Sequence, residues 1–230
     1  MYQTENPCGP NAKSGRTREA LKNKLTWIFA LFIFGYVGAE VSLGGWIIIF
    51  MTNVRSARPL VASATSTGFW AGMTVGRLFL GFVTGRIGEY RATLIYLFLA
   101  ATLELIFWLV PNLVVSGIAV AFLGMFMGPM FPTAIVFVTK LLPRSLHVGT
   151  IGFATAFGGS GGAVFPFIVG AIAQAKGIKT LQPVILALIG AISVLWILIP
   201  RKEVKGHGSD IEESGLELRD RGGTDHAREL

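Results

Sequence analysis

The sequence predicts an all-α integral membrane protein with six transmembrane helices. Of its 230 residues, 52% are hydrophobic and only 14% are charged, whereas an ordinary soluble domain carries about 25% charged residues. The apolar residues form six runs, each long enough to cross about 30 Å of hydrocarbon as a helix rising about 1.5 Å per residue. Runs this long and continuous are unlike barrel strands. The composition excludes a soluble enzyme.

Short polar connections separate the six predicted spans. In chain order the spans cover Leu25–Met51, Leu60–Thr84, Ala92–Val110, Leu113–Thr139, Val148–Ala173 and Leu181–Pro200. We expect three parts in the chain: a basic cytosolic segment over residues 1–24, a transmembrane domain over residues 25–200, and a disordered cytosolic tail over residues 201–230. The tail is expected to be disordered because it is charged, mixed in sign and rich in glycine.

The positions of Lys and Arg predict the orientation. If both termini face the cytosol, 16 of the 20 basic residues fall on the inner side, and only Arg55, Arg58, Lys176 and Lys179 fall outside. Basic residues concentrate on the cytosolic side of membrane proteins. We therefore expect both termini in the cytosol, with the plasma membrane favoured over an internal one. The net charge of +7 comes mainly from these flanks, which argues against a nucleic-acid partner.

Glycines recur every four residues in the second, fourth and fifth spans. They are Gly68, Gly72 and Gly76, then Gly124 and Gly128, then Gly158 and Gly162. Such small-residue stripes predict close packing between helix backbones. Gly128, Pro129 and Pro132 also predict a kink in the fourth span. The glycine-dense part of the fifth span, residues 153–166, is expected to be an irregular or broken helix, as at transporter gates and sites.

Glu40 is the deepest charged residue. It lies about 22 Å along the first span, past the membrane midplane. Tyr36, one turn earlier, shares its face and can hydrogen-bond the carboxyl group, while Gly44, one turn later, leaves room beside it. Because a charge at this depth is costly, Glu40 is expected to carry a proton or to bind solute. The alternative is a neutral side chain that only hydrogen-bonds a neighbouring helix.

Two other charged residues lie well inside the spans. Glu104 is about six residues from the outer end of the third span, so we expect it to extend to the water and to be structural. Arg77 is about 10 Å deep in the second span, well short of the depth of Glu40. On depth, a direct ion pair between Arg77 and Glu40 is not expected, and Arg77 is expected to reach the inner surface or a partner in a cytosolic loop.

The connection after the second span, GFVTGRIGEYR, resembles the signature loop of the major facilitator superfamily. The matching residues are Gly81, Gly85, Arg86, Gly88 and Arg91. In that family the loop controls opening on the inner side, so the resemblance implies that these residues, with Arg77, form a gating loop. The family's first-half copy usually has an acid where this chain has Gly85, and basic residues where it has Glu89 and Tyr90. The loop is therefore more similar to the second-half copy.

Two further segments narrow the resemblance. GYVGAEVSLGGWI, around Glu40, and GMFMGPMFPT resemble the seventh and tenth helices of the fucose-permease-like branch, which includes fungal transporters and animal sodium-dependent glucose carriers. The resemblance implies the C-terminal six-helix half of a twelve-helix transporter. Its first, second, fourth and fifth spans would line the central cavity, which places Glu40 in the cavity and Glu104 at the periphery.

The resemblance also implies a set of solute or coupling contacts. They are Tyr36, Glu40, Phe69, Trp70, Met125, Phe126 and Ser160. The aromatic residues can stack on a sugar or another flat organic ring, although core packing is the commoner use of Phe and Met.

We therefore expect a secondary-active or facilitative transporter of a small organic solute, with sugars as candidates and a proton or sodium as candidate coupling ion. Alternating access would require a second six-helix half, either an N-terminal half or a second copy. The alternative is a non-transporting fragment, or an assembly or regulatory subunit of a membrane complex. No phosphate-binding loop, metal-ligand cluster or nucleophile constellation points to an enzyme, a metal site or a cofactor.

Overall fold

The computed structural model describes residues 21–199, except for the side chains of residues 144 and 145. The expected disordered tail over residues 201–230 and most of the expected basic segment over residues 1–24 lie outside the described residues.

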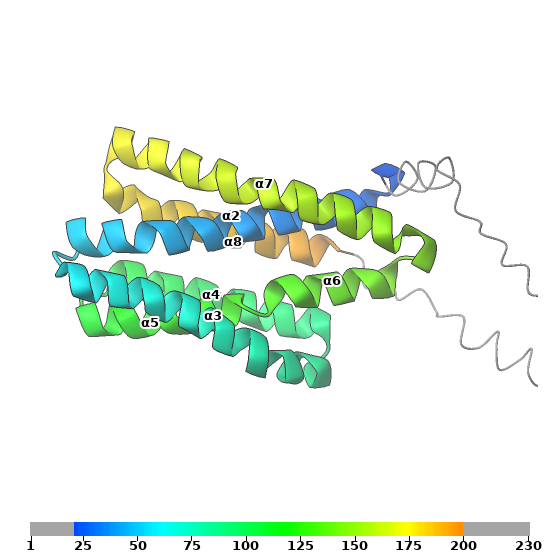
Figure 1. Cartoon of the computed structure of the whole chain (residues 1–230), viewed down its shortest axis with the longest axis horizontal. Helices are drawn as coiled ribbons and strands as arrows, with labels where there is room; N and C mark the ends of the chain where they lie inside the picture. Colours follow the sequence, from blue (N-terminus) through cyan, green and yellow to red (C-terminus); the bar gives the residue numbers. More distant parts are fainter. Residues whose placement is uncertain (1–20, 200–230) are drawn as a thin grey trace, which may run out of the picture. The chain divides into compact units, whose positions relative to one another are not determined.

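Seven α-helices and one short 3-10 helix make up the described part of the chain (Figure 1). They are α2 (Lys24–Asn53), α3 (Pro59–Ile87), α4 (Glu89–Leu109), α5 (Leu113–Met127), α6 (Met130–Leu141), α7 (Arg144–Lys176), η1 (Ile178–Thr180) and α8 (Leu181–Leu198). The all-helical prediction is confirmed. Helices α5 and α6 divide the fourth predicted span between them.

Five segments of the described chain are long and apolar enough to cross a membrane, counting α5 with α6 as one and η1 with α8 as one. The remaining predicted span is α3, which has 29 residues but a less apolar composition. Its length alone is enough to cross about 30 Å of hydrocarbon.

Helices α2 and α8 place the two ends of the described chain at one end of the bundle, which we call the terminal end (Figure 1). The opposite end, called the far end, carries the α2–α3, α4–α5 and α7–α8 connections. An even number of passes puts both ends of the bundle's chain on one side of a membrane. Which side faces the cytosol stays a prediction.

The helix contacts fall into two related sets. Helix α2 packs against α7 and α8, and α5 packs against α3 and α4. If the first, second and third spans are matched with the fourth, fifth and sixth, the contacts of α2 with α7 and α8 correspond to the contacts of α5 with α3 and α4. This correspondence is that of an inverted internal repeat, as found in many transporters.

The small-residue stripe of α3 lies directly against the backbone of α5. A Cβ atom at Gly72 would overlap the carbonyl oxygen of Ala121, and one at Gly76 would overlap that of Met125. From the α5 side, a Cβ atom at Gly124 would overlap a carbonyl oxygen of α3. The prediction of close packing is confirmed, because only glycine leaves room for the two backbones to touch.

The predicted kink in the fourth span is also confirmed. Helix α5 ends at Met127 and α6 begins at Met130. Pro129 and Pro132 have no N–H group, so neither can donate to the carbonyl group four residues earlier. The carbonyl oxygens of Met125 and Gly128 therefore lack their ordinary helical donors.

The expectation of a broken fifth span is wrong, because α7 runs without interruption from Arg144 to Lys176 with Pro166 inside it. Its glycines serve packing instead. A Cβ atom at Gly158 would overlap the side chain of Ile33, and one at Gly161 would overlap the carbonyl oxygen of Phe34. The close contact with α2 compensates the weak helix propensity of glycine, because tertiary packing supplies most of the stability of helices in proteins.

The motif expected to form a gating loop is almost entirely helical. Helix α3 continues to Ile87 and α4 begins at Glu89, so Gly88 alone joins them. Gly88 has φ 93° and ψ 139°, a conformation that a side chain would strain. Gly81, Gly85 and Arg86 lie in α3, and Arg91 lies in the first turn of α4. The motif therefore forms a one-residue joint at the terminal end.

Candidate functional site

Glu40 and Arg77 form an ion pair in the middle of the bundle. Arg77 Nη2 lies 3.2 Å from Glu40 Oε1, and the side chains are 49% and 13% exposed, respectively. The expectation that depth would keep these residues apart is wrong, as is the expectation that Arg77 reaches the inner surface.

The predicted depths of Glu40 and Arg77 were counted from the terminal end of each span, and this choice caused the error. Counted from the far end, where a short turn joins α2 to α3, Glu40 is about 20 Å down α2 and Arg77 about 27 Å down α3. The difference of about 7 Å is within reach of a long Arg side chain extending toward a Glu. Helix α3 also continues three residues past the predicted end at Thr84, which placed Arg77 too near the terminal end.

Arg77 also binds the break between α5 and α6. Its Nε donates to the carbonyl oxygen of Gly128 at 3.2 Å, and its Nη2 lies 3.3 Å from the sulfur of Met73. Gly128 is the residue whose carbonyl group loses its helical donor to Pro132. One guanidinium group therefore connects the carboxylate of Glu40 to the kink of the fourth span.

Tyr36 supports the same break from α2. Its hydroxyl group is fully buried and donates to the carbonyl oxygen of Met127 at 2.9 Å. The hydroxyl group also interacts electrostatically with Glu40 and Arg77. Tyr36, Glu40 and Arg77 are thus brought together, and their common neighbour is the backbone of the α5–α6 break.

Trp70 closes the site toward the far end. The indole ring fills the space beside Gly44, where an added Cβ atom would overlap it. The space that Gly44 leaves next to Glu40 is therefore occupied by an aromatic ring from α3. Trp70 is still 43% exposed, so part of the ring remains available to a ligand.

The other predicted contact residues are not joined to the ion pair. Phe69 is fully buried at the α3–α5 contact, and Met125 lies against the glycine stripe of α3. Phe126 points toward α4, with its ring centroid 6.1 Å from that of Tyr96. Ser160 is exposed on α7, and its hydroxyl group donates to the carbonyl oxygen of Phe157 at 2.6 Å.

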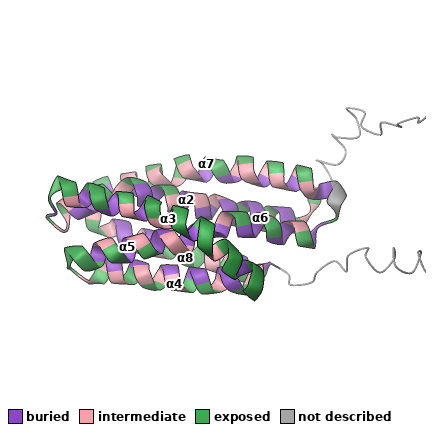
Figure 2. Cartoon of the chain, turned by 60° about the horizontal axis from the view of Figure 1, so that its bottom comes forward, coloured by how far each residue is buried: buried purple, intermediate pink, exposed green. Residues whose placement is uncertain are grey.

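Exposure is uneven over the helices that flank the site. Figure 2 shows many exposed and half-exposed residues along α7 and along the terminal-end half of α3. In a bilayer, a half-exposed Arg in the middle of a span is costly unless it faces water or protein. The open side of Arg77 is therefore a side where lipid is disfavoured.

Chemically, the ion pair offers both kinds of hydrogen-bonding group. The carboxylate of Glu40 accepts and the guanidinium of Arg77 donates. A ligand with several hydroxyl groups can use both, while Trp70 presents an apolar ring face. Among the described residues, no group of three or more His, Cys, Asp or Glu side chains is placed to hold a metal ion.

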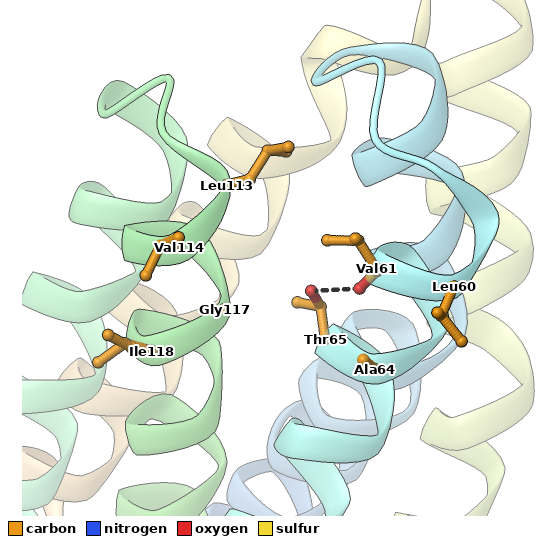
Figure 3. A pocket seen from close by; sticks show the side chains of 8 residues that line it. All are labelled: Leu60, Val61, Ala64, Thr65, Leu113, Val114, Gly117 and Ile118. Atoms are coloured by element: carbon orange, nitrogen blue, oxygen red, sulfur yellow. Dashed lines mark hydrogen bonds between the residues drawn. The ribbon is translucent and has the colours of Figure 1, made fainter.

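An apolar groove lies elsewhere, between the far-end turns of α3 and α5. Figure 3 shows Leu60, Val61, Ala64 and Thr65 facing Leu113, Val114, Gly117 and Ile118. The hydroxyl group of Thr65 is turned to its own helix, where it donates to the carbonyl oxygen of Val61 at 2.9 Å. The lining of the groove is mostly apolar and includes no residue of the predicted site.

A second ion pair was not predicted from the sequence. Lys140 Nζ, at the end of α6, lies 2.7 Å from Glu89 Oε1, in the first turn of α4. It ties the α6 side of the terminal end to the Gly88 joint. Glu89 was noted only as a departure from the family motif, and nothing in the spacing of the sequence connects it with Lys140.

Glu104 does not reach water, which corrects the expectation from its position near a span end. It is fully buried, and neither carboxyl oxygen has a hydrogen-bond partner among the described residues. The side chain of Arg55 covers this end of α4, where Nη2 donates to the carbonyl oxygens of Phe107 and Trp108 at 2.7 and 2.9 Å.

Several known proteins are similar to this chain in sequence, and others are similar in fold. Over 199 residues the chain is 36% identical to Bypass of stop codon protein 6 of Saccharomyces cerevisiae, covering 82% of this chain and 40% of that protein. It is 32% identical to a Glucose/galactose transporter of Brucella abortus, over 68% of this chain and 38% of that protein. The Glucose/mannose transporter GlcP of Bacillus subtilis is 25% identical over 72% of this chain and 42% of its own length.

Among solved structures, the E. coli Fucose:proton symporter, FucP, matches with a TM-score of 0.71 and 19% identity, over 82% of this chain and 46% of that one. A structure of FucP in the outward conformation matches with a TM-score of 0.73 and 18% identity, over 86% and 48%. The chain therefore spans less than half the length of these relatives, and its six spans have the fold of half of such a transporter.

The sequence model of the Major Facilitator Superfamily matches residues 27–222. Together with the sugar-transporter relatives and the FucP fold, this match confirms the resemblance to the fucose-permease-like branch. The chain is thus an integral, multi-pass membrane protein related to transporters rather than enzymes, and it belongs to the Major Facilitator Superfamily.

Proposed function

We propose that this chain forms one six-helix wall of a sugar transporter, and that the ion pair of Glu40 and Arg77 lines the solute path. The observation that carries the proposal is the half-exposed Arg77, paired with Glu40 in the middle of two spans. A wall with such a charge on its open side is suited to face water and solute rather than lipid. The relatives whose names specify glucose, galactose, mannose or fucose support a sugar as the solute.

The proposed mode of recognition follows from the groups present. Sugar hydroxyl groups both donate and accept, so they complement the donors of Arg77 and the acceptor oxygens of Glu40. The exposed part of Trp70 supplies a surface for the apolar face of a sugar ring. A proton or sodium is proposed as the coupling ion, with Glu40 as its carrier.

Transport in this scheme requires a second six-helix half. Alternating access works by rocking two bundles about a site held between them, and one bundle supplies one wall. The partner is either an N-terminal half or a second copy of this chain. In this arrangement the Gly88 joint and the ion pair of Glu89 and Lys140 act at the gate on the terminal end, which we place in the cytosol at the plasma membrane.

Sugar binding is tested by titrating glucose, galactose, mannose and fucose into the purified chain and following tryptophan fluorescence. We expect a saturable change that is lost in Trp70→Phe and kept in Trp27→Phe, since Trp27 is exposed near the terminal end, away from the site. Glu40→Gln replaces hydrogen bonds to a charged group, worth about 1.5–3 kcal/mol, by neutral ones worth about 0.5–1.5 kcal/mol, so the variant should weaken binding roughly 5- to 12-fold. The matched control is Glu89→Gln, which removes the other ion pair.

Transport is tested separately with labelled sugar in liposomes, with the oligomeric state measured in the same sample. We expect no saturable flux from a demonstrated monomer. Sugar binding without flux would favour the two-half scheme. Flux from a monomer would refute the need for a second half, and the absence of both binding and flux for every sugar would refute the proposed solute class and favour a non-transporting subunit.

A further inference from the structure

Three buried polar side chains lie in the far-end half of the bundle, away from the ion pair of Glu40 and Arg77. Glu104, Gln182 and Ser116 come from three different helices and are each fully buried. Both carboxyl oxygens of Glu104, both amide atoms of Gln182 and the hydroxyl oxygen of Ser116 have no hydrogen-bond partner among the described residues. We call these three residues the far-end polar cluster.

The register of α4 and α8 puts Glu104 and Gln182 at nearly the same height in the bundle. Near the terminal end, Trp196 Nε1 donates to the carbonyl oxygen of Tyr90 at 3.2 Å, which fixes the register of these two antiparallel helices. From there, about 14 residues toward the far end lead from Tyr90 to Glu104 and from Trp196 to Gln182. Fourteen residues correspond to about 21 Å and nearly four turns on each helix. Glu104 and Gln182 are therefore at nearly equal heights, and each is on nearly the same face of its helix as Tyr90 or Trp196.

Helix α5 adds Ser116 to the same region. The rings of Tyr96 and Phe126 meet with centroids 6.1 Å apart and fix the register of α4 against α5. Counting from that contact places Ser116 within about half a turn of the height of Glu104. Glu104, Gln182 and Ser116 are therefore buried polar groups at similar heights on three packed helices.

No described ionisable residue on the helices packed against α4 lies at the height of Glu104. Helices α5 and α8 contain no ionisable side chain, α6 contributes Lys140 at the terminal end, and α3 contributes Arg77 in its middle and Arg86 at the terminal end. At the far end of α4, Arg55 Nη2 donates to the carbonyl oxygens of Phe107 and Trp108, and no ion pair is formed by Glu104 among the described residues. An ionised carboxylate at this place would therefore be buried without a counter-charge, which is strongly unfavourable.

We propose that Glu104 is a proton-binding site, holding its proton at neutral pH, and that the amide of Gln182 is the group that recognises the protonated form. A neutral carboxyl group has one O–H donor and one carbonyl acceptor, and a primary amide has the same combination. Rotation of the two side chains allows a cyclic pair in which O–H donates to the amide carbonyl and N–H donates to the carboxyl carbonyl. An ionised carboxylate only accepts, so it cannot complete this pair.

The proton site is independent of the proposed sugar path, because it involves neither Glu40 nor Arg77. It is tested by infrared spectroscopy of the full chain at neutral pH in a detergent without ester groups, using the carbonyl stretch of a protonated carboxylic acid. We expect this band in the wild-type protein, its loss in Glu104→Gln, and its retention in Glu40→Gln. Absence of the band from the wild type, or its persistence in Glu104→Gln, would overturn the proposal.

Two further measurements test the partner and the ion. Hydrogen bonding lowers the carbonyl stretching frequency, so Gln182→Met, which keeps an unbranched side chain of similar length, should shift the Glu104 band to higher frequency. An unshifted band in a variant that keeps the wild-type elution profile would reject Gln182 as the partner. Loss of the wild-type band on addition of sodium would show that the site takes a metal cation instead, and would overturn the assignment to a proton.

Discussion

The contact between α3 and α5 leads to a quantitative prediction about Gly76. A Cβ atom there would overlap the carbonyl oxygen of Met125 and lie 2.8 Å from its carbonyl carbon and 3.0 Å from its Cα. These are backbone atoms, so no rotamer change relieves the overlap. Because non-bonded carbons prefer about 3.5–4.0 Å, Gly76→Ala requires the two helices to separate by roughly 1 Å.

The cost of that separation is estimated from overpacked protein interiors, where added methyl groups destabilise by about 1–3 kcal/mol. For a chain of this size, 1 kcal/mol changes the unfolding midpoint by about 2–4 °C, so Gly76→Ala should lower it by roughly 2–12 °C. The control is Gly81→Ala on the same helix, where nothing lies within 4 Å of the added atom. There the better helix propensity of Ala predicts no loss, or a gain of about 0.4–1 kcal/mol.

The unfolding midpoints of both variants can be measured in detergent under the same conditions. Each sample is heated, and the fraction that stays monodisperse is read by size-exclusion chromatography. Equal midpoints for Gly76→Ala and Gly81→Ala would refute the claim that the α3–α5 backbones are in direct contact. A larger loss at Gly81 would point instead to a partner bundle covering that face of α3.

Three other predictions follow from the described residues. Glu40→Gln, which keeps size and hydrogen bonding but cannot ionise, should abolish transport or its pH dependence in an active assembly while abundance stays unchanged; wild-type transport with wild-type pH dependence would make Glu40 structural. Gly88→Ala should destabilise the chain by about 1–3 kcal/mol, because its φ of 93° strains a side chain, and an unchanged unfolding midpoint would contradict this. Protease-accessible tags at Met1 and Leu230 should both report the cytosolic side, and opposite sides would mean an odd number of spans.

The helical spans could be predicted because membrane thickness fixes the length of an apolar run. The glycine stripes of α3 and α5 could also be interpreted, because a helix without side chains at every fourth position can approach a neighbouring backbone closely. The fifth span failed because the sequence reports the intrinsic weakness of a glycine-rich helix but not the neighbour that supports it. In α7 that neighbour is α2, which packs directly on Gly158 and Gly161.

The candidate site was predicted in part. Tyr36, Glu40 and Trp70 were found from depth and from family resemblance, whereas the pairing of Glu40 with Arg77 was missed. Depth along each helix is a one-dimensional measure, and its error depends on where the helix is taken to end. The burial of Glu104 was missed for a different reason: distance from a span end says nothing about whether a connection such as the turn carrying Arg55 covers that end.

The bond between Arg77 and the carbonyl group of Gly128 makes the break in the fourth span an adjustable joint. In an unbroken helix, the angle between two halves is set by backbone hydrogen bonds that no ligand can reach. Here one of the freed carbonyl groups is held by a side chain that also holds a carboxylate on another helix. A solute that drew Arg77 away from Gly128 would remove this support from the break, so in the proposed transporter occupancy beside Glu40 would change the bond that holds the bend of the fourth span.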